Sequence, residues 1–245
     1  MDSHYAGLFA AYSTVAAIVW GLVLTIKPKT LEHPWPHYPH PWRDLGIFLA
    51  AIAAVLAIGQ LYTRGMLLPE RDIARKALNQ ILIFAPVLVF VAWKRSAAVA
   101  FLPLRAAPIN FGLGLVLAAC AVAVYGIARG RADEIGTVFA FLIDHWHIPL
   151  LAQVLLEDIA IAILLGLAVA VIGTRGAVVA TALLFAAAHL PALLASGAAA
   201  ASLSPLLLDT VLGVIMLGAV LRTRSIWWYW PVHSILDLLQ FYKPG

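Results

Sequence analysis

Long apolar stretches separated by short polar segments run along this 245-residue chain. A membrane-crossing helix needs about 20 apolar residues, whereas a membrane strand would alternate apolar and polar residues at every second position. The stretches here do not alternate, so they predict helices. We expect about eight spans, at approximately 6–26, 45–62, 78–93, 110–128, 148–172, 176–195, 205–221 and 226–241.

The polar segments between the spans predict turns and interfacial loops. The segment TRGMLLPERDIARK at 63–76 separates the second span from the third, and Arg175-Gly176 predicts a turn between the fifth and sixth. The apolar stretch 135–143 is too short to span alone and leads into the polar DHWH at 144–147. The sequence contains no internal repeat and no polar stretch of domain size, so we expect one all-α, polytopic membrane bundle comprising residues 1–245.

Composition supports the membrane assignment, because 63% of the residues are hydrophobic and only 11% are charged. A soluble domain carries roughly a quarter charged residues. The formal net charge of +4 is spread between the apolar runs, so we expect no nucleic-acid partner. The single cysteine, Cys120, excludes an intrachain disulfide.

Two adjacent acids interrupt the apolar span at 148–172. Glu157 lies roughly 14 Å from Ile148 along a helix, which is near the middle of a hydrocarbon core about 30 Å thick. A carboxylate at that depth costs a few kcal/mol on insertion scales, roughly 2.5–3.5 for aspartate. Glu157 and Asp158 must therefore face other helices or water, and they need polar partners.

Other ionisable residues in the last spans are the candidate partners. His189 lies some 13 residues after Gly176, so the short turn between antiparallel neighbours would bring it to the height of Glu157. His233 and Asp237 are four residues apart and share one face of the last helix. We expect these side chains to form one polar cluster.

Three kinds of chemistry suit such a cluster. A carboxylate beside an imidazole can deprotonate water as a general base. A second imidazole can stabilise the oxyanion that forms when water attacks an amide. Carboxylates and histidines are also ligands of zinc. The residue types alone do not separate these options.

The order of these residues resembles the motifs of a known family. Glu157-Asp158, Phe185-Ala-Ala-Ala-His189 and His233-Ser-Ile-Leu-Asp237 are similar to the EExxxR, FxxxH and HxxxN or HxxxD motifs of the CPBP family. That family, also called Abi, comprises CAAX proteases and bacteriocin-processing enzymes and is related to the Ras-converting CAAX endoprotease. The resemblance covers roughly 155–240 and includes the basic turn and aromatic run LRTRSIWWYW.

The resemblance implies an intramembrane endopeptidase of about eight helices, with a family-like catalytic core at about 148–241. It implies that Glu157 and His189 activate water, that His233 and Asp237 hold the oxyanion, and that Asp158 orients its partners. It favours a glutamate-type mechanism without a cofactor, with a divalent metal such as zinc as the alternative. The implied partners are the lipid bilayer and a membrane-anchored or membrane-embedded protein or peptide substrate, in a prokaryotic cell (inner) membrane.

The sequence departs from the family motif at two positions. The second acid is Asp158 instead of glutamate, and Ala162 stands where the motif has arginine. Arg175, Arg222 or Arg224 are candidate substitutes for that arginine. If none compensates, a non-catalytic member is the alternative, either a peptide-binding scaffold or a bacteriocin-immunity protein. A proton-coupled carrier is a third hypothesis, but no inverted repeat supports it.

Two further histidine-containing segments and one acid are interpreted as interfacial. The segment EHPWPHYPHPW at 32–42 holds His33, His37 and His40, and its prolines prevent a helical ligand spacing. Tryptophan, tyrosine and proline together are typical of a membrane interface. The same interpretation applies to His145-Trp146-His147 and to Asp209, so we expect no metal site at any of them.

Overall fold

The computed structural model describes residues 3–25, 38–94, 101–190 and 203–242, and these residues form helices and turns without a strand. The all-α prediction is therefore confirmed. The α-helices are α1 (Ser3–Thr25), α2 (Pro41–Thr63), α3 (Ile73–Ile83), α4 (Ala85–Trp93), α6 (Ala107–Ala128), α7 (Ile135–Leu142), α8 (Ile148–Ala188), α10 (Leu203–Thr223) and α11 (Tyr229–Phe241). Short 3₁₀ turns lie at Leu104–Ala106, Ala132–Glu134 and His145–His147.

Local sequence determines where several of these helices begin. Proline stands in the first turn of α2, α4, α6 and α8, where its missing N–H has no helical partner to lose. Asp72 caps α3, and its side chain accepts a hydrogen bond from the Arg75 backbone N–H at 2.8 Å.

Among the described residues, four helical segments are long and apolar enough to cross a membrane. They are Ala6–Thr25, Pro41–Thr63, Leu104–Ala128 and His145–Ala188. A fifth results if α3 and α4 count as one span, but that pair is bent by 58°. The expected count of about eight is not confirmed. The expected third span, 78–93, is broken at Phe84, and α11 has only 13 residues where we expected a span at 226–241.

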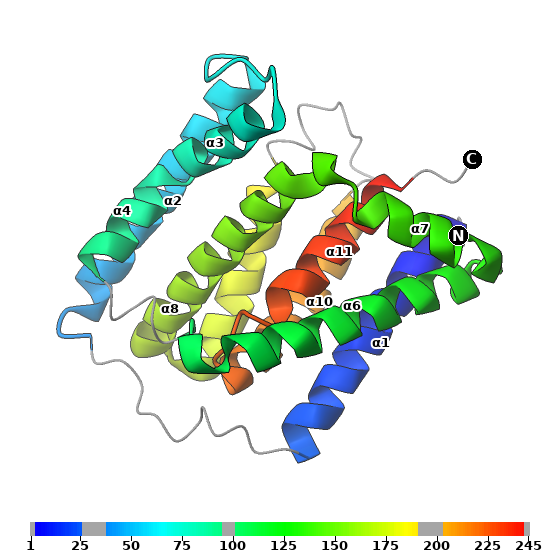
Figure 1. Ribbon diagram of the computed structural model, residues 1–245. Coiled ribbons are helices and arrows are strands. Elements are labelled where there is room, and N and C mark those ends of the chain that lie inside the picture. The colour runs from blue at the N-terminus through cyan, green and yellow to red at the C-terminus, as the bar shows by residue number, and fades with distance from the viewer. Residues whose placement is uncertain (1–2, 26–37, 95–100, 191–202, 243–245) are drawn as a thin grey trace.

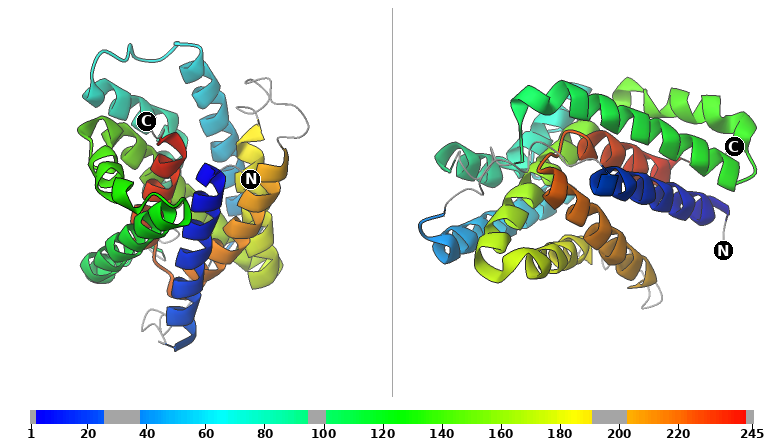
Figure 2. Two further views of the ribbon diagram at one scale, coloured as in Figure 1. Left: turned by 90° about the vertical axis from the view of Figure 1, so that its right-hand side faces the viewer. Right: turned by 90° about the horizontal axis from the view of Figure 1, so that it is seen from below.

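The longest element, α8, is bent into two halves at Gly173. This glycine has φ 73° and ψ 170°, a conformation that side chains with a Cβ rarely adopt. The first half (lime) and the second half (yellow) lie side by side in Figures 1 and 2. The two expected spans 148–172 and 176–195 are thus neighbours, and the break comes two residues before the turn expected at Arg175-Gly176.

The helix α8 contributes to both hydrophobic clusters of the fold. One cluster joins α8 to α1, α6, α10 and α11, and includes Leu165, Val220 and Leu238. The other joins α8 to α2, α3 and α4, and includes Phe48 and Leu167. In Figure 1 the α2–α4 unit stands on one side of α8, and α6, α11 and α1 stand on the other. Side chains of α8 therefore face partners on both sides.

Candidate active site

Four of the five side chains predicted for the site line one cavity of about 270 Å³. These four are Glu157, His189, His233 and Asp237. Glu157 comes from the first half of α8, His189 follows the end of its second half, and the other two come from α11. Helices α1 and α10 complete the wall with Tyr12 and Met216, among others. The bend at Gly173 and the placement of α11 thus bring together residues up to 80 positions apart.

The fifth predicted residue, Asp158, lies behind the cavity and binds His233. The Nδ1 of His233 is 2.8 Å from Asp158 Oδ1, and the residue Asp158 is only 1% exposed. An ionised carboxylate only accepts, so the Nδ1–H of His233 donates this hydrogen bond. The opposite ring nitrogen, Nε2, lies 3.7 Å from Asp237 Oδ2. His233 is therefore held between two carboxylates.

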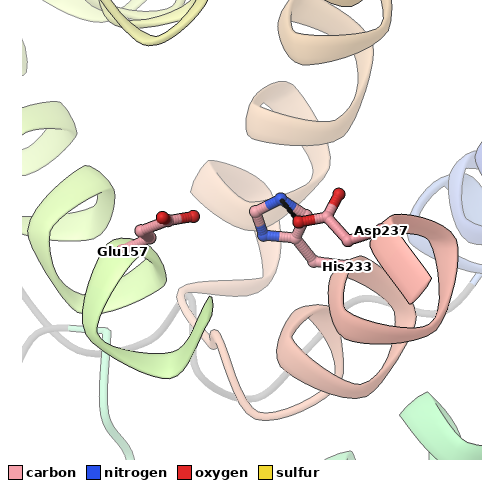
Figure 3. A group of neighbouring side chains, drawn as sticks. All are labelled: Glu157, His233 and Asp237. Atoms are coloured by element: carbon pink, nitrogen blue, oxygen red, sulfur yellow. Dashed lines mark ion pairs between the residues drawn. The ribbon is translucent and has the colours of Figure 1, made fainter. Parts of the chain in front are cut away.

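Glu157 faces the pair on α11. Figure 3 shows its carboxylate pointing from α8 toward His233 and Asp237, which lie four residues apart on α11. One turn earlier on α8, Gln153 donates a hydrogen bond from Nε2 to Glu157 Oε1 at 2.8 Å. This bond uses one of the four acceptor sites of the Glu157 carboxylate and restrains its orientation.

His189 is fixed in one tautomer when its ring is neutral. Its Nδ1 lies 2.9 Å from the backbone carbonyl of Phe185, which can only accept, so Nδ1–H donates. The lone pair then resides on Nε2, which can act as a base or a metal ligand. The Phe185 ring packs edge-on against His189 at 4.9 Å and against His233 at 5.8 Å between centroids. The phenylalanine of the FxxxH motif thus lies between the two imidazoles.

The same side chains include a candidate metal-binding group. One ligand atom each from Glu157, His233 and Asp237 lies within 4.8 Å of the others. Two carboxylates and an imidazole are a donor set that zinc accepts. The bond between His233 Nδ1 and Asp158 also matches the second-shell contact that metal-binding histidines make. These residues therefore fit a divalent metal as well as a metal-free site.

The structure adds cavity residues that the sequence analysis did not single out. Gln153 and Tyr229 each lie four residues before a predicted site residue, so the helical i, i+4 rule could have found them. The Tyr229 ring stacks on His233 at 5.2 Å. Tyr12 and Gln240 join the cavity from α1 and α11, and Gln240 Nε2 donates to the Tyr12 hydroxyl at 3.3 Å. No signal in the sequence links Tyr12 to this site.

The suggested substitutes for the motif arginine do not bind Asp158. Among the described residues, the ion-pair partner of Asp158 is His233. No ion pair there joins Asp158 to Arg175, Arg222 or Arg224. Asp158 Oδ2 is buried without a hydrogen-bond partner there. Ala162, at the motif position, is 3% exposed and packs in the larger hydrophobic cluster. The suggestion of a substitute arginine is therefore wrong, because the basic side chains do not reach this carboxylate.

The histidines of the other two segments that the structure describes do not line the cavity. His145 is exposed beside Asp144, with Nδ1 3.1 Å from Oδ1, and His147 packs against Phe141. His40 precedes the first residue of α2. His33 and His37 lie outside the described residues, as does the side chain of Asp209.

Residues 140–239 match the family model described as type II CAAX prenyl endopeptidase Rce1-like. No curated protein and no solved structure matches the chain. The matched segment contains the whole of α8 and nearly all of α11, and with them all five predicted site residues. The family resemblance expected from the motifs is therefore confirmed.

Proposed function

The segment 140–239 belongs to the CAAX prenyl endopeptidase family, and from this premise we propose that the protein is an intramembrane endopeptidase. Its substrate is a membrane-anchored or membrane-embedded protein, and the protein resides in a prokaryotic inner membrane. The observation that carries the proposal is the single cavity lined by Glu157, His189, His233 and Asp237. Such a set supplies a base for water and a donor for the oxyanion.

In this mechanism Glu157 and His189 activate the attacking water. Glu157 takes a proton from the water as its oxygen attacks the carbonyl carbon of the scissile peptide bond. The C–N bond then breaks, and the leaving amine takes a proton from Glu157 or His189. Gln153 holds the Glu157 carboxylate through Oε1 and so orients it for this step.

His233 stabilises the oxyanion through Nε2–H. Because Nδ1–H donates to Asp158, the ring must carry both protons to donate from Nε2 as well. The carboxylates of Asp158 and Asp237 on its two sides compensate the positive charge. An ionised Asp237 cannot donate a hydrogen bond to the oxyanion. It supports the oxyanion indirectly, because its negative charge orients and stabilises the doubly protonated His233 ring.

A metal-dependent version uses the same residues differently. Glu157, His233 and Asp237 would hold the ion, and Asp158 would orient His233 from behind. A bound divalent ion would supply Lewis-acid activation of water or of the peptide carbonyl. We favour the metal-free version, in which Glu157 remains free to act as the base.

A non-catalytic role is the second candidate, and one observation favours it. The arginine of the family motif is replaced by Ala162, and Asp158 Oδ2 is left without a hydrogen-bond partner among the described residues. A protein with this defect would bind a peptide as a scaffold or immunity protein and leave it uncut.

Peptide cleavage in proteoliposomes tests these alternatives. The probes are a fluorogenic farnesylated CAAX peptide and its non-prenylated counterpart, with wild type, Glu157→Gln and His189→Ala, each with and without EDTA and 1,10-phenanthroline. We expect cleavage by wild type, loss in both variants and no effect of chelator. Loss with chelator, reversed by zinc, would establish the metal-dependent version. Peptide binding without cleavage by wild type would establish the non-catalytic role.

A further inference from the structure

Tyr229 lines the same cavity as Glu157 and His233, and the proposed mechanism gives it no task. It is the first residue of α11 and lies one helical turn before His233, so the two side chains share one face of that helix. Its ring stacks on the His233 imidazole at 5.2 Å between centroids, with the two ring planes 22° apart. Tyr229 is therefore held against the residue that we expect to bind the oxyanion.

The hydroxyl of Tyr229 is unpaired and still accessible. The residue is only 8% exposed, and its hydroxyl makes no hydrogen bond among the described residues. The hydroxyl of Ser234, on the same helix, also lacks a partner there, but it is fully buried and reaches no ligand. The Tyr229 hydroxyl, by contrast, keeps accessible surface on a residue that lines the cavity. A molecule in the cavity can therefore reach it.

The other polar side chains of this cavity already have partners within the part of the chain that the structure describes. The two amides, Gln153 and Gln240, each donate a hydrogen bond, and the second phenol, Tyr12, accepts the one from Gln240. Both histidines donate from Nδ1–H, and both carboxylates accept a hydrogen bond or form an ion pair. A polar group left without a partner in a nearly enclosed position costs free energy unless a ligand supplies the partner. Tyr229 is the cavity residue to which this applies.

Peptide hydrolysis requires a donor at this place. When water attacks the peptide carbonyl, the carbonyl oxygen becomes an oxyanion, and donors aimed at that oxygen lower the barrier. His233 supplies one donor through Nε2–H. Asp237 lies beside it, at a position where the family motif has asparagine or aspartate, and an ionised carboxylate cannot donate. A phenol keeps its proton at neutral pH and can donate where Asp237 cannot.

We propose that Tyr229 is a further catalytic residue, whose phenolic O–H donates the second hydrogen bond to the oxyanion. Because the rings of Tyr229 and His233 stack nearly parallel, their in-plane donors can point side by side at one oxygen. The hydrogen bond strengthens as the carbonyl carbon becomes tetrahedral and weakens when the C–N bond breaks and the carbonyl re-forms. The proton stays on Tyr229 throughout. This inference rests on the proposed peptidase function and adds one residue to its chemistry.

Steady-state kinetics in proteoliposomes test the hydroxyl separately from the ring. Tyr229→Phe keeps the ring that stacks on His233 and removes only the donor, so kcat falls about 10²-fold or more while KM stays within about twofold. The thermal midpoint does not fall, because the hydroxyl makes no hydrogen bond among the described residues. The control is Tyr242→Phe, a buried tyrosine directly after α11 that does not line the cavity, and it keeps the wild-type kcat. A wild-type kcat for Tyr229→Phe overturns the proposal.

A phosphinate analogue of the farnesylated CAAX peptide separates this proposal from the peptidase function. Its tetrahedral phosphinate replaces the scissile peptide bond and carries an anionic oxygen where the oxyanion would form. In fluorescence anisotropy, Tyr229→Phe binds the analogue more weakly than wild type, by about the factor by which kcat/KM falls. Equal affinity of the two proteins overturns the role of the hydroxyl, whether or not wild type cleaves the peptide. Weaker binding by Tyr229→Phe without any cleavage by wild type overturns the peptidase function and supports the hydroxyl as an anion donor.

Discussion

The imidazole of His233 lies 2.8 Å from the carboxylate of Asp158, which joins α11 to α8 across 75 positions of sequence. This bond fixes the plane of the His233 ring and leaves Nε2 beside Asp237 in the cavity. The second acid of the motif therefore orients the histidine, while the first, Glu157, faces the cavity itself.

Replacing Asp158 tests whether this orientation matters for cleavage. We expect Asp158→Asn to lower kcat by about 10²-fold or more, because the imidazolium loses its buried counter-charge and its fixed geometry. Cleavage rates and the thermal midpoint of the purified variant measure the effect. Asp133→Asn, an exposed acid in the turn before α7, is the control. A fully active Asp158→Asn would remove the orienting role.

Replacing Asp237 separates the metal-free from the metal-dependent mechanism. In the metal-free version, Asp237→Asn keeps most of the activity, within about tenfold, because Asp158 still balances the charge of the His233 imidazolium at 2.8 Å and the new amide can donate to the oxyanion. In the metal-dependent version it loses a charged ligand, so activity falls and returns only at raised zinc concentration. Titration of zinc against the cleavage rate of wild type, Asp237→Asn and Asp237→Ala distinguishes the two.

Gln153 is expected to position the general base. Gln153→Met has a similar length without a donor, so Glu157 gains rotational freedom and kcat falls about five- to tenfold while KM changes little. Gln153→Asn retains the amide on a shorter side chain, so its kcat should lie between the kcat of wild type and that of Gln153→Met. A change in KM alone would assign Gln153 to substrate binding instead.

Gly114 is expected to be essential for the contact between α6 and the start of α11. A Cβ built at Gly114 would lie 2.5 Å from the backbone oxygen of Trp228, so the two segments would have to separate. Gly114→Ala should cost about 1–3 kcal/mol of stability and lower the thermal midpoint. The matched control is Gly112→Ala on the same helix, because nothing lies within 4 Å of its Cβ position. Equal midpoints for the two variants would contradict the close approach.

The sequence by itself determined the helical membrane fold and the residues gathered in the site. An ionisable residue in an apolar run costs free energy when the run enters a membrane, and the neighbouring sequence alone reveals that cost. Glu157, Asp158 and His189 therefore stand out without a structure. The i, i+4 spacing likewise placed His233 and Asp237 on one face of α11. The number of spans did not follow from hydropathy alone, because hydropathy does not register the break at Phe84, where Pro86 lies in the first turn of a new helix.

Only the tertiary structure decided which carboxylate holds which histidine. Asp158 and Asp237 are both plausible partners of His233 in sequence, and the packing of α11 on α8 gives the short bond to Asp158. A periodic pattern reports which face of a helix is polar, but a hydrogen bond depends on the relative placement of two helices within a few tenths of an ångström.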